Sequence, residues 1–171
     1  AHRPTPPAGA VVSCDLNYRA KLWNYGTAAR DFMPRLAESA DVLIANEEDC
    51  QKSLGIEARA DVSSSALSDE AYRELSERVL EAFPNLGTVA ITLRESLSAG
   101  HNRWSACIND STAFYRTERF DITHIVDRVG AGDSFAAALI YGLSVFPAAA
   151  ASWEKELWLA CSTNARARSS K

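Results

Sequence analysis

The sequence predicts an α/β fold in which parallel strands alternate with helices. Short apolar runs at residues 10–14, 41–46 and 88–93 are each followed by polar residues. The two long intervals between these runs carry helical periodicity. Because parallel strands need a crossover connection, usually a helix, this alternation is typical of βαβ units in an open sheet.

The bulk composition agrees with a globular domain that acts on small molecules. The chain has 171 residues, of which 47% are hydrophobic and 23% charged, whereas disordered chains are less hydrophobic. A formal net charge of -4 does not favour nucleic acid or an anionic membrane as a partner. The cysteines form no CxxC pair and the N-terminal stretch lacks the pattern of a signal peptide, so we expect reduced thiols and a cytoplasmic protein; the cysteines are Cys14, Cys50, Cys107 and Cys161.

The first half of the chain predicts two buried strands and two helices. Residues 10–14 and 41–46 are the expected strands, and the helix between them, over residues 27–39, contains Pro34, which shortens or kinks it. The second helix is expected to start after Ser68 as its N-cap and to end near Pro84. Its apolar stripe consists of Tyr72, Leu75, Val79 and Phe83.

The second half predicts a third strand, a hairpin and a last helix. Residues 88–93 form the expected strand, and residues 103–108 and 112–117 form the arms of a hairpin at the sheet edge. The helix is expected over residues 132–146, with an apolar stripe that comprises Phe135, Leu139, Gly142, Leu143 and Phe146. Residues 134–153 carry no charge, but their glycine and proline favour a buried helix over a membrane span.

The turn Gly130-Ala131-Gly132-Asp133 at the start of that helix predicts an anion site. Glycines allow a close approach of the backbone, and the helix N-terminus presents free N–H groups and positive dipole charge to a phosphate. Asp133 would then accept the proton of a hydroxyl that attacks phosphorus. The alternative is structural, because aspartate is a preferred helix N-cap and an acid at a helix N-terminus is generally stabilising. The turn is neither a Walker A loop nor a GxGxxG fingerprint.

The segment "DRVGAGDSFAAALIYGL" closely resembles the C-terminal signature of the PfkB (ribokinase-like) carbohydrate kinases. The resemblance implies a three-layer α/β/α, Rossmann-like fold with a mostly parallel sheet. It makes Asp133 the catalytic base and the backbone of Gly130, Ala131 and Gly132 the anion hole. Asp127 corresponds to the acid of an adjoining cation-binding loop, where a monovalent cation is an optional ligand, and Arg128 stands where threonine is common.

Two further segments resemble the parts of these kinases that handle the nucleotide. "NEED", with Asn46 and Asp49, resembles the N-x-x-E motif that helps to position magnesium and phosphate through water, although Asp49 is shorter than the usual glutamate. A capped helix N-terminus would explain the same residues. "TLRES" resembles the segment that contacts ATP, which makes Thr92, Arg94, Glu95 and Ser96 candidates; a weak surface ion pair is the alternative.

"CDLNYRAKLW", residues 14–23, bears on the acceptor of the phosphoryl group. It resembles the 2-keto-3-deoxygluconate kinase branch of the family, with Asn17 and Arg19 as substrate residues. Arginine suits a sugar acid because its planar fork can bind a carboxylate through two hydrogen bonds. The alternative for Arg19 is a structural salt bridge with Asp15 or another acid.

The resemblance covers residues 10–147 and corresponds to the C-terminal half of such kinases. We therefore expect a single partial domain over residues 1–171 with an incomplete sheet, no lid over the sugar and a divergent tail at residues 148–171. The expected activity is ATP- and Mg²⁺-dependent phosphorylation of 2-keto-3-deoxygluconate, and the isolated fragment could lack it. A fructokinase or ribokinase specificity and a non-catalytic nucleotide-binding remnant are the alternatives. A homodimer is a further option.

Overall fold

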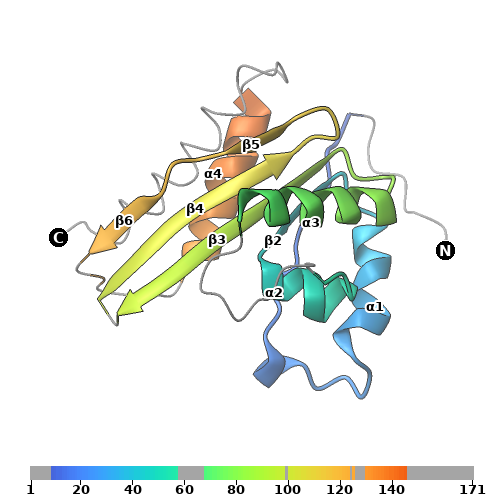
Figure 1. Cartoon of the computed structure of the whole chain (residues 1–171). Helices are drawn as coiled ribbons and strands as arrows, with labels where there is room; N and C mark the ends of the chain where they lie inside the picture. The colour runs from blue at the N-terminus through green and yellow to red at the C-terminus, as the bar shows by residue number, and fades with distance from the viewer. Residues whose placement is uncertain (1–8, 58–67, 99, 124, 126–129, 146–171) are drawn as a thin grey trace. The chain divides into compact units, whose positions relative to one another are not determined.

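The computed structural model of the chain describes residues 9–57, 68–98, 100–123, 125 and 130–145 (Figure 1). Asp127, Arg128, Cys161 and the predicted tail at residues 148–171 lie outside the described residues. The chain divides into two compact units, one formed by Ala1–Ile91 with Asn109–Thr112 and the other by Thr92–Ile108 with Ala113–Lys171. The expectation of one partial domain stays a prediction, and the units are described in turn.

The first unit contains the predicted parallel strands. Strands β1 (Ser13–Asp15) and β2 (Val42–Ala45) run parallel, and β2 also pairs in parallel with the start of β3 (Thr88–Ser98). In register, Ser13 lies opposite Val42 and Ala45 opposite Ile91. Each crossover contains a helix, as the apolar runs predicted.

The helices of this unit follow their sequence signals closely. Helix α1 (Ala29–Ala37) contains Pro34, and α3 (Asp69–Ala82) begins after Ser68, whose hydroxyl accepts a hydrogen bond from the Ala71 N–H at 3.3 Å. The predicted stripe of α3 is buried, with Leu75 and Val79 fully enclosed. Between β1 and α1 lies a 3₁₀ turn, η1 (Ala20–Leu22); after β2 come α2 (Glu47–Asp49) and a π-helical turn, η2 (Cys50–Leu54).

Strand β1 is less buried than the sequence predicted. Both Ser13 and Asp15 are exposed and Cys14 is half-buried, whereas all four residues of β2 are buried. The reason is position: within the described residues β1 pairs with β2 alone and forms the edge of the sheet. An apolar run identifies a strand but does not say how many neighbours the strand has.

The second unit is built on antiparallel strands and one helix. Strands β4 (His101–Asn109) and β5 (Phe114–Arg116) form the predicted hairpin, and β6 (Phe120–Thr123), which the sequence analysis did not predict, runs antiparallel to β4. The hydrogen-bonded strand order is β1-β2-β3-β4-β5, with β6 on β4. The sheet is thus mixed, parallel at β1–β3 and antiparallel around β4.

Strand β3 is longer than its apolar core. The sequence analysis ended the strand at residue 93, but β3 continues to Ser98 and contains all of "TLRES". Its buried residues give way to exposed ones beyond Leu93, so the hydrophobic signal ended while the backbone pairing continued. Figure 1 shows β3 and β4 as one long hairpin.

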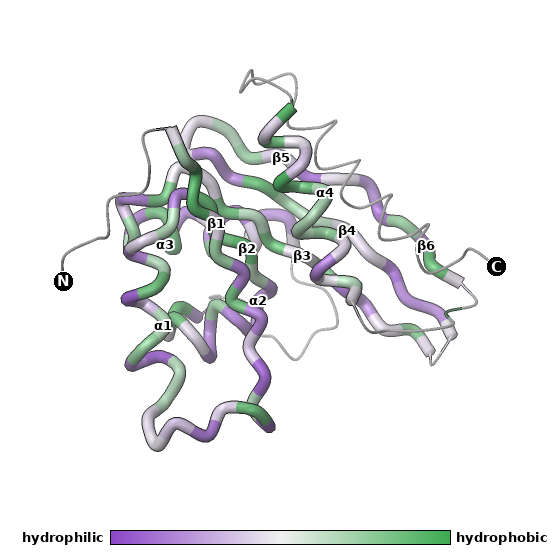
Figure 2. The backbone as a smooth tube through the Cα atoms, turned by 180° about the vertical axis from the view of Figure 1, so that it is seen from behind, coloured by the Kyte–Doolittle hydropathy of each residue, from purple (hydrophilic) through white to green (hydrophobic). Residues whose placement is uncertain are grey.

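Helix α4 (Ala131–Val145) supplies the apolar centre of the second unit. Of the predicted stripe, Phe135 and Leu139 are fully enclosed and Gly142 is buried, whereas Leu143 is half-buried and Phe146 lies outside the described residues. Figure 2 shows hydrophobic colouring along much of this helix. Among the described residues no helix combines the length and apolar character needed to cross a membrane.

Candidate active site

The predicted site residues fall into two groups, one in each unit. Asn17, Arg19, Asn46 and Asp49 lie at the ends of β1 and β2 in the first unit. The residues of "TLRES" and the turn at Gly130–Asp133 belong to the second unit. The cation-loop prediction at Asp127 falls outside the described residues.

The turn after β2 is organised by a reciprocal capping box. The Asp49 N–H donates to the side-chain oxygen of Asn46 at 2.8 Å, and the Asn46 N–H donates to Asp49 Oδ2 at 3.1 Å. This arrangement satisfies two N–H groups at the helix start that otherwise lack partners. The capped-helix alternative therefore describes the local geometry of Asn46 and Asp49 correctly.

The Asp49 carboxylate does more than cap its own helix. Its second oxygen, Oδ1, accepts a hydrogen bond from the Tyr18 N–H at 2.9 Å, across 31 residues of sequence. The side chain is only 4% exposed, so the charge is largely removed from water. Burial raises the pKa of Asp49 above its ordinary value, and the hydrogen bonds from Tyr18 and Asn46 and the charge of Arg19 work in the opposite direction. Burial likewise raises the pKa of its neighbour Glu47.

The predicted substrate loop follows β1 directly. The Leu16 N–H donates to the Ile44 carbonyl at 3.0 Å, which extends the pairing of β1 with β2 by one step. Asn17 then adopts a φ of 38°, in the left-handed region that asparagine tolerates better than most residues. Arg19 is exposed, and its guanidinium donates to the Tyr18 carbonyl at 2.8 Å.

Three aromatic rings pack against one another in and after this loop. The Trp23 ring lies 6.3 Å from Tyr18 and 5.0 Å from Tyr25, measured between ring centroids. The Trp23 indole N–H donates to the Thr27 carbonyl at 2.6 Å. These contacts assign Trp23 to the packing role expected of an amphipathic ring with one polar group.

In the second unit, α4 begins directly after a glycine in a left-handed conformation. Gly130 adopts a φ of +77°, which favours glycine over any side-chain-bearing residue. The first intrahelical bond runs from the Ser134 N–H to the Gly130 carbonyl at 2.9 Å. The three preceding N–H groups, of Ala131, Gly132 and Asp133, therefore have no carbonyl partner within the helix.

Asp133 lies inside the first turn of α4 rather than at its cap. It is the third residue of the helix, it is exposed, and no described residue donates a hydrogen bond to its carboxylate. A capping aspartate would sit before the helix and accept an N–H bond from its first turn. The N-cap form of the structural alternative therefore does not describe Asp133, whereas an acid that stabilises the first turn of the helix does.

The "TLRES" residues divide between the two faces of β3. Alternation along the strand places Thr92, Arg94 and Ser96 on one face and Glu95 on the other. Glu95 Oε2 lies 3.7 Å from a guanidinium nitrogen of Arg103 on β4. Glu95 thus forms the kind of weak ion pair that was the alternative to an ATP contact, and its partner lies on the neighbouring strand.

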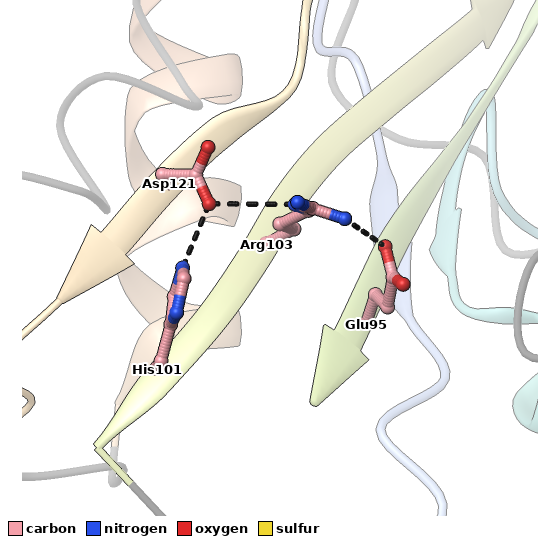
Figure 3. A network of polar contacts seen from close by, with 4 residues as sticks. All are labelled: Glu95, His101, Arg103 and Asp121. Carbon is pink, nitrogen blue, oxygen red and sulfur yellow. Dashed lines mark hydrogen bonds and ion pairs between the residues drawn. The ribbon is translucent and has the colours of Figure 1, made fainter. Parts of the chain in front are cut away.

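Figure 3 shows that Glu95 belongs to a network of four charged or titratable side chains. Arg103 also reaches Asp121 Oδ1 at 3.4 Å, and the same oxygen lies 2.7 Å from His101 Nε2. Sequence reasoning missed this network because it depends on β6, whose residue Asp121 lies directly opposite Arg103. The sequence shows these charged residues only in separate segments and does not indicate that the segments pair.

The network predicts a small, salt-sensitive contribution to stability. His101 and Arg103 lower the pKa of Asp121. A lowered pKa in the folded state means that the contribution is present above the ordinary value of 3.8 and is lost as the pH falls below it. We expect Asp121→Asn to lower the melting temperature slightly at pH 7 in low salt, and the difference to shrink as the pH falls below the ordinary pKa of 3.8 or in about 1 M NaCl.

Thermal denaturation followed by circular dichroism measures this effect. Glu118→Gln, at another exposed acid of the same unit, is the matched control and should leave the melting temperature unchanged. A difference for Asp121→Asn that persists in high salt would contradict an electrostatic origin.

The described residues do not form a metal centre by themselves. No group of three or more histidine, cysteine, aspartate or glutamate side chains gathers in a way that could hold an ion. Both oxygens of Asp49 accept a backbone N–H group, which leaves each oxygen one lone pair for a metal ion or for its water. Magnesium keeps several waters and is commonly held by substrate phosphates, which this arrangement suits.

Comparison with known proteins identifies the relatives of this chain. The structure superposes on the 2-dehydro-3-deoxygluconokinase of Thermotoga maritima with a TM-score of 0.78 and 43% identity, covering 94% of this chain and 45% of that one. The 2-dehydro-3-deoxygalactonokinase of Haloferax volcanii is 30% identical over 133 residues, which are 78% of this chain and 35% of that protein. Fructokinase-2 of Solanum lycopersicum is 28% identical over 133 residues, 78% of this chain and 34% of that protein.

These comparisons confirm the predicted fold class and family. The chain has the mixed sheet flanked by helices of its structural relatives, and it spans about a third of the length of the curated relatives it matches. The family model described as "pfkB family carbohydrate kinase" matches residues 7–163. This chain therefore belongs to the pfkB family of carbohydrate kinases.

Proposed function

We propose that this chain carries the phosphoryl-transfer half of an ATP-dependent sugar kinase whose acceptor is 2-keto-3-deoxygluconate. The observation that carries the proposal is the start of α4, where an exposed carboxylate, Asp133, lies in the same turn as three N–H groups without helical partners. Such a turn can hold a phosphoryl oxygen and accept a proton in one place. Family membership favours this use of the turn over a purely structural one.

In the proposed reaction the acceptor hydroxyl attacks the terminal phosphorus of ATP. A bond forms between the hydroxyl oxygen and phosphorus, the bond from phosphorus to the ADP oxygen breaks, and Asp133 takes the hydroxyl proton. The N–H groups of Ala131, Gly132 and Asp133 stabilise negative charge on the transferred group. Gly130 provides the positive φ at the residue before the helix.

The remaining candidates serve the nucleotide and its metal ion. Thr92, Arg94 and Ser96 share one face of β3 and are the better candidates for ATP contacts, whereas Glu95 is engaged with Arg103. Magnesium would arrive with the ATP phosphates, with Asn46 and Asp49 acting through water. Asp127 stays the candidate for a cation loop, and a monovalent cation stays optional.

The identity of the acceptor depends on Arg19. Its side chain is exposed at the end of β1, and a guanidinium can bind the carboxylate of a sugar acid. The name of the Thermotoga maritima relative supports this choice, because 2-dehydro-3-deoxygluconate is the same compound. The fructokinase relative favours the alternative of a neutral sugar. A cytoplasmic location and a homodimer belong to the proposal as predictions.

We expect Arg19→Ala to remove the preference for a sugar acid. ADP release by the purified chain would be measured with Mg-ATP and either 2-keto-3-deoxygluconate or fructose. The KM for the acid should rise about tenfold or more, because a charge-assisted pair of hydrogen bonds is lost. The KM for fructose, which has no carboxylate, should stay unchanged. Arg30→Ala, at an exposed arginine of α1, is the control.

Three other results would redirect the proposal. Equal preference in wild type and Arg19→Ala would remove Arg19 from acid recognition. Faster turnover of fructose than of the acid would establish the alternative specificity. If calorimetry shows nucleotide binding but no sugar causes ADP release from ATP, the non-catalytic remnant is favoured.

A further inference from the structure

Two segments far apart in sequence meet at the buried carboxylate of Asp49. One is the turn after β2, where the carboxylate closes the capping box with Asn46. The other is the loop after β1, whose Tyr18 N–H donates to the same carboxylate at 2.9 Å. A capping box needs only one carboxylate oxygen, so the contact to Tyr18 is an additional function of this side chain.

The loop after β1 needs such a contact to hold its shape. Leu16 is anchored by its bond to Ile44 and by burial of its side chain, which is 4% exposed. The next residue, Asn17, takes a φ of 38°, in the left-handed region that residues other than glycine adopt at some cost. Without a partner for the Tyr18 N–H, a return of Asn17 to an ordinary backbone conformation would displace Tyr18 and Arg19. The hydrogen bond from Tyr18 to Asp49 prevents this relaxation.

The held peptide is the one from which Arg19 extends. The Tyr18 carbonyl accepts a hydrogen bond from the Arg19 guanidinium at 2.8 Å, so the same residue is bound to Asp49 on one side and to Arg19 on the other. Recognition of a carboxylate by a guanidinium depends on direction as well as charge. A fixed Tyr18 peptide therefore limits the directions from which the Arg19 guanidinium can approach a ligand.

We propose that Asp49 is a positioning residue, which holds the loop Asn17–Arg19 so that Arg19 presents its guanidinium to the carboxylate of the acceptor. The role in acceptor recognition rests on the proposed function, whereas the hydrogen bonds of Asp49 and Tyr18 do not depend on it. It assigns to Asp49 a direct structural link with the acceptor residues in addition to the water-mediated role near magnesium. The substrate class concerned is a sugar acid.

Amide hydrogen exchange tests the link without any substrate. In Asp49→Ala and Asp49→Glu, the Tyr18 amide should exchange about tenfold faster than in wild type, because its acceptor is lost in the first variant and displaced in the second. Asp49→Glu keeps the charge and guards against a variant that fails to fold. Ser68→Ala is the matched control: it removes a cap from α3, lowers stability and should leave Tyr18 exchange unchanged. Unchanged Tyr18 exchange in both Asp49 variants would overturn the proposal.

A double-mutant cycle tests the purpose of the link. Binding of 2-keto-3-deoxygluconate would be measured by calorimetry for Asp49→Glu, Arg19→Ala and the double variant. If Asp49 acts through Arg19, Asp49→Glu should weaken binding about tenfold in the presence of Arg19 and have no further effect in its absence. Equal losses in both backgrounds, or full affinity in Asp49→Glu, would overturn a positioning role.

The two arms separate failure of this inference from failure of the proposed function. If wild type does not bind the acid at all, the proposed acceptor is wrong. The role assigned to Asp49 in acid recognition then fails too, even if the exchange rate of the Tyr18 amide depends on Asp49. If wild type binds the acid but Tyr18 exchange does not respond to Asp49, the acceptor stands and the positioning inference fails.

Discussion

Replacing Asp133 with asparagine should lower kcat for phosphoryl transfer at least about a hundredfold, the usual scale of a lost general base. Asparagine has nearly the same shape but cannot take the hydroxyl proton. The carboxylate is exposed and no described residue donates a hydrogen bond to it, so the exchange should leave the fold intact. The measurement is ADP release under saturating Mg-ATP and acceptor, together with a thermal melt.

The control for this experiment is Asp31→Asn. Asp31 also lies in the first turn of a helix, α1, and is exposed, so its loss changes the helix dipole interaction in the same way. It should leave kcat unchanged. A rate for Asp133→Asn within a factor of about three of wild type would remove Asp133 from the role of base, because general-base losses are far larger.

Replacing Phe135 with alanine should destabilise the second unit by about 3–5 kcal/mol. Phe135 is fully enclosed and is the largest such side chain of the described residues, so its truncation removes apolar burial and leaves a cavity. Urea denaturation at pH 7 measures the change. Native domains have a free energy of unfolding of roughly 5–15 kcal/mol, so this loss is a large fraction of the total.

Tyr141→Ala is the matched control on the same helix. Tyr141 is 58% exposed, and its loss should change the stability by about 0.5 kcal/mol or less. The contrast between Asp133 and Phe135, two positions apart on α4, separates catalytic from structural contributions. Comparable destabilisation by Tyr141→Ala and Phe135→Ala would contradict the assigned burial of this helix.

Local signals in the sequence were sufficient for most of the first unit. Its strands, the Ser68 cap and the buried stripe of α3 all depend on residues close together in the chain, where propensity and periodicity act. The same holds for α4 and for the glycine turn before it, since the positive φ of Gly130 is a local requirement. The family resemblance, carried by contiguous motifs, was confirmed by the match over residues 7–163.

Long-range pairing limited prediction elsewhere. Strand β3 extends past Leu93 because β4 supplies backbone partners, and no apolar signal marks the added residues. Strand β6 has four residues and was recognised only through its pairing with β4. The low burial of β1 likewise depends on the number of neighbouring strands and not on its own residues.

The sequence by itself determined the alternation of strands and helices, the glycine turn before α4 and the kinase family, because each depends on contiguous residues. The tertiary structure decided that Asp49 binds the peptide of Tyr18 and that Glu95 pairs with Arg103. Both contacts join segments that are separate in the chain, and such contacts form only when strand register brings their ends together. The loop that carries Arg19 is therefore defined by its sequence but oriented by a carboxylate 31 residues beyond Tyr18.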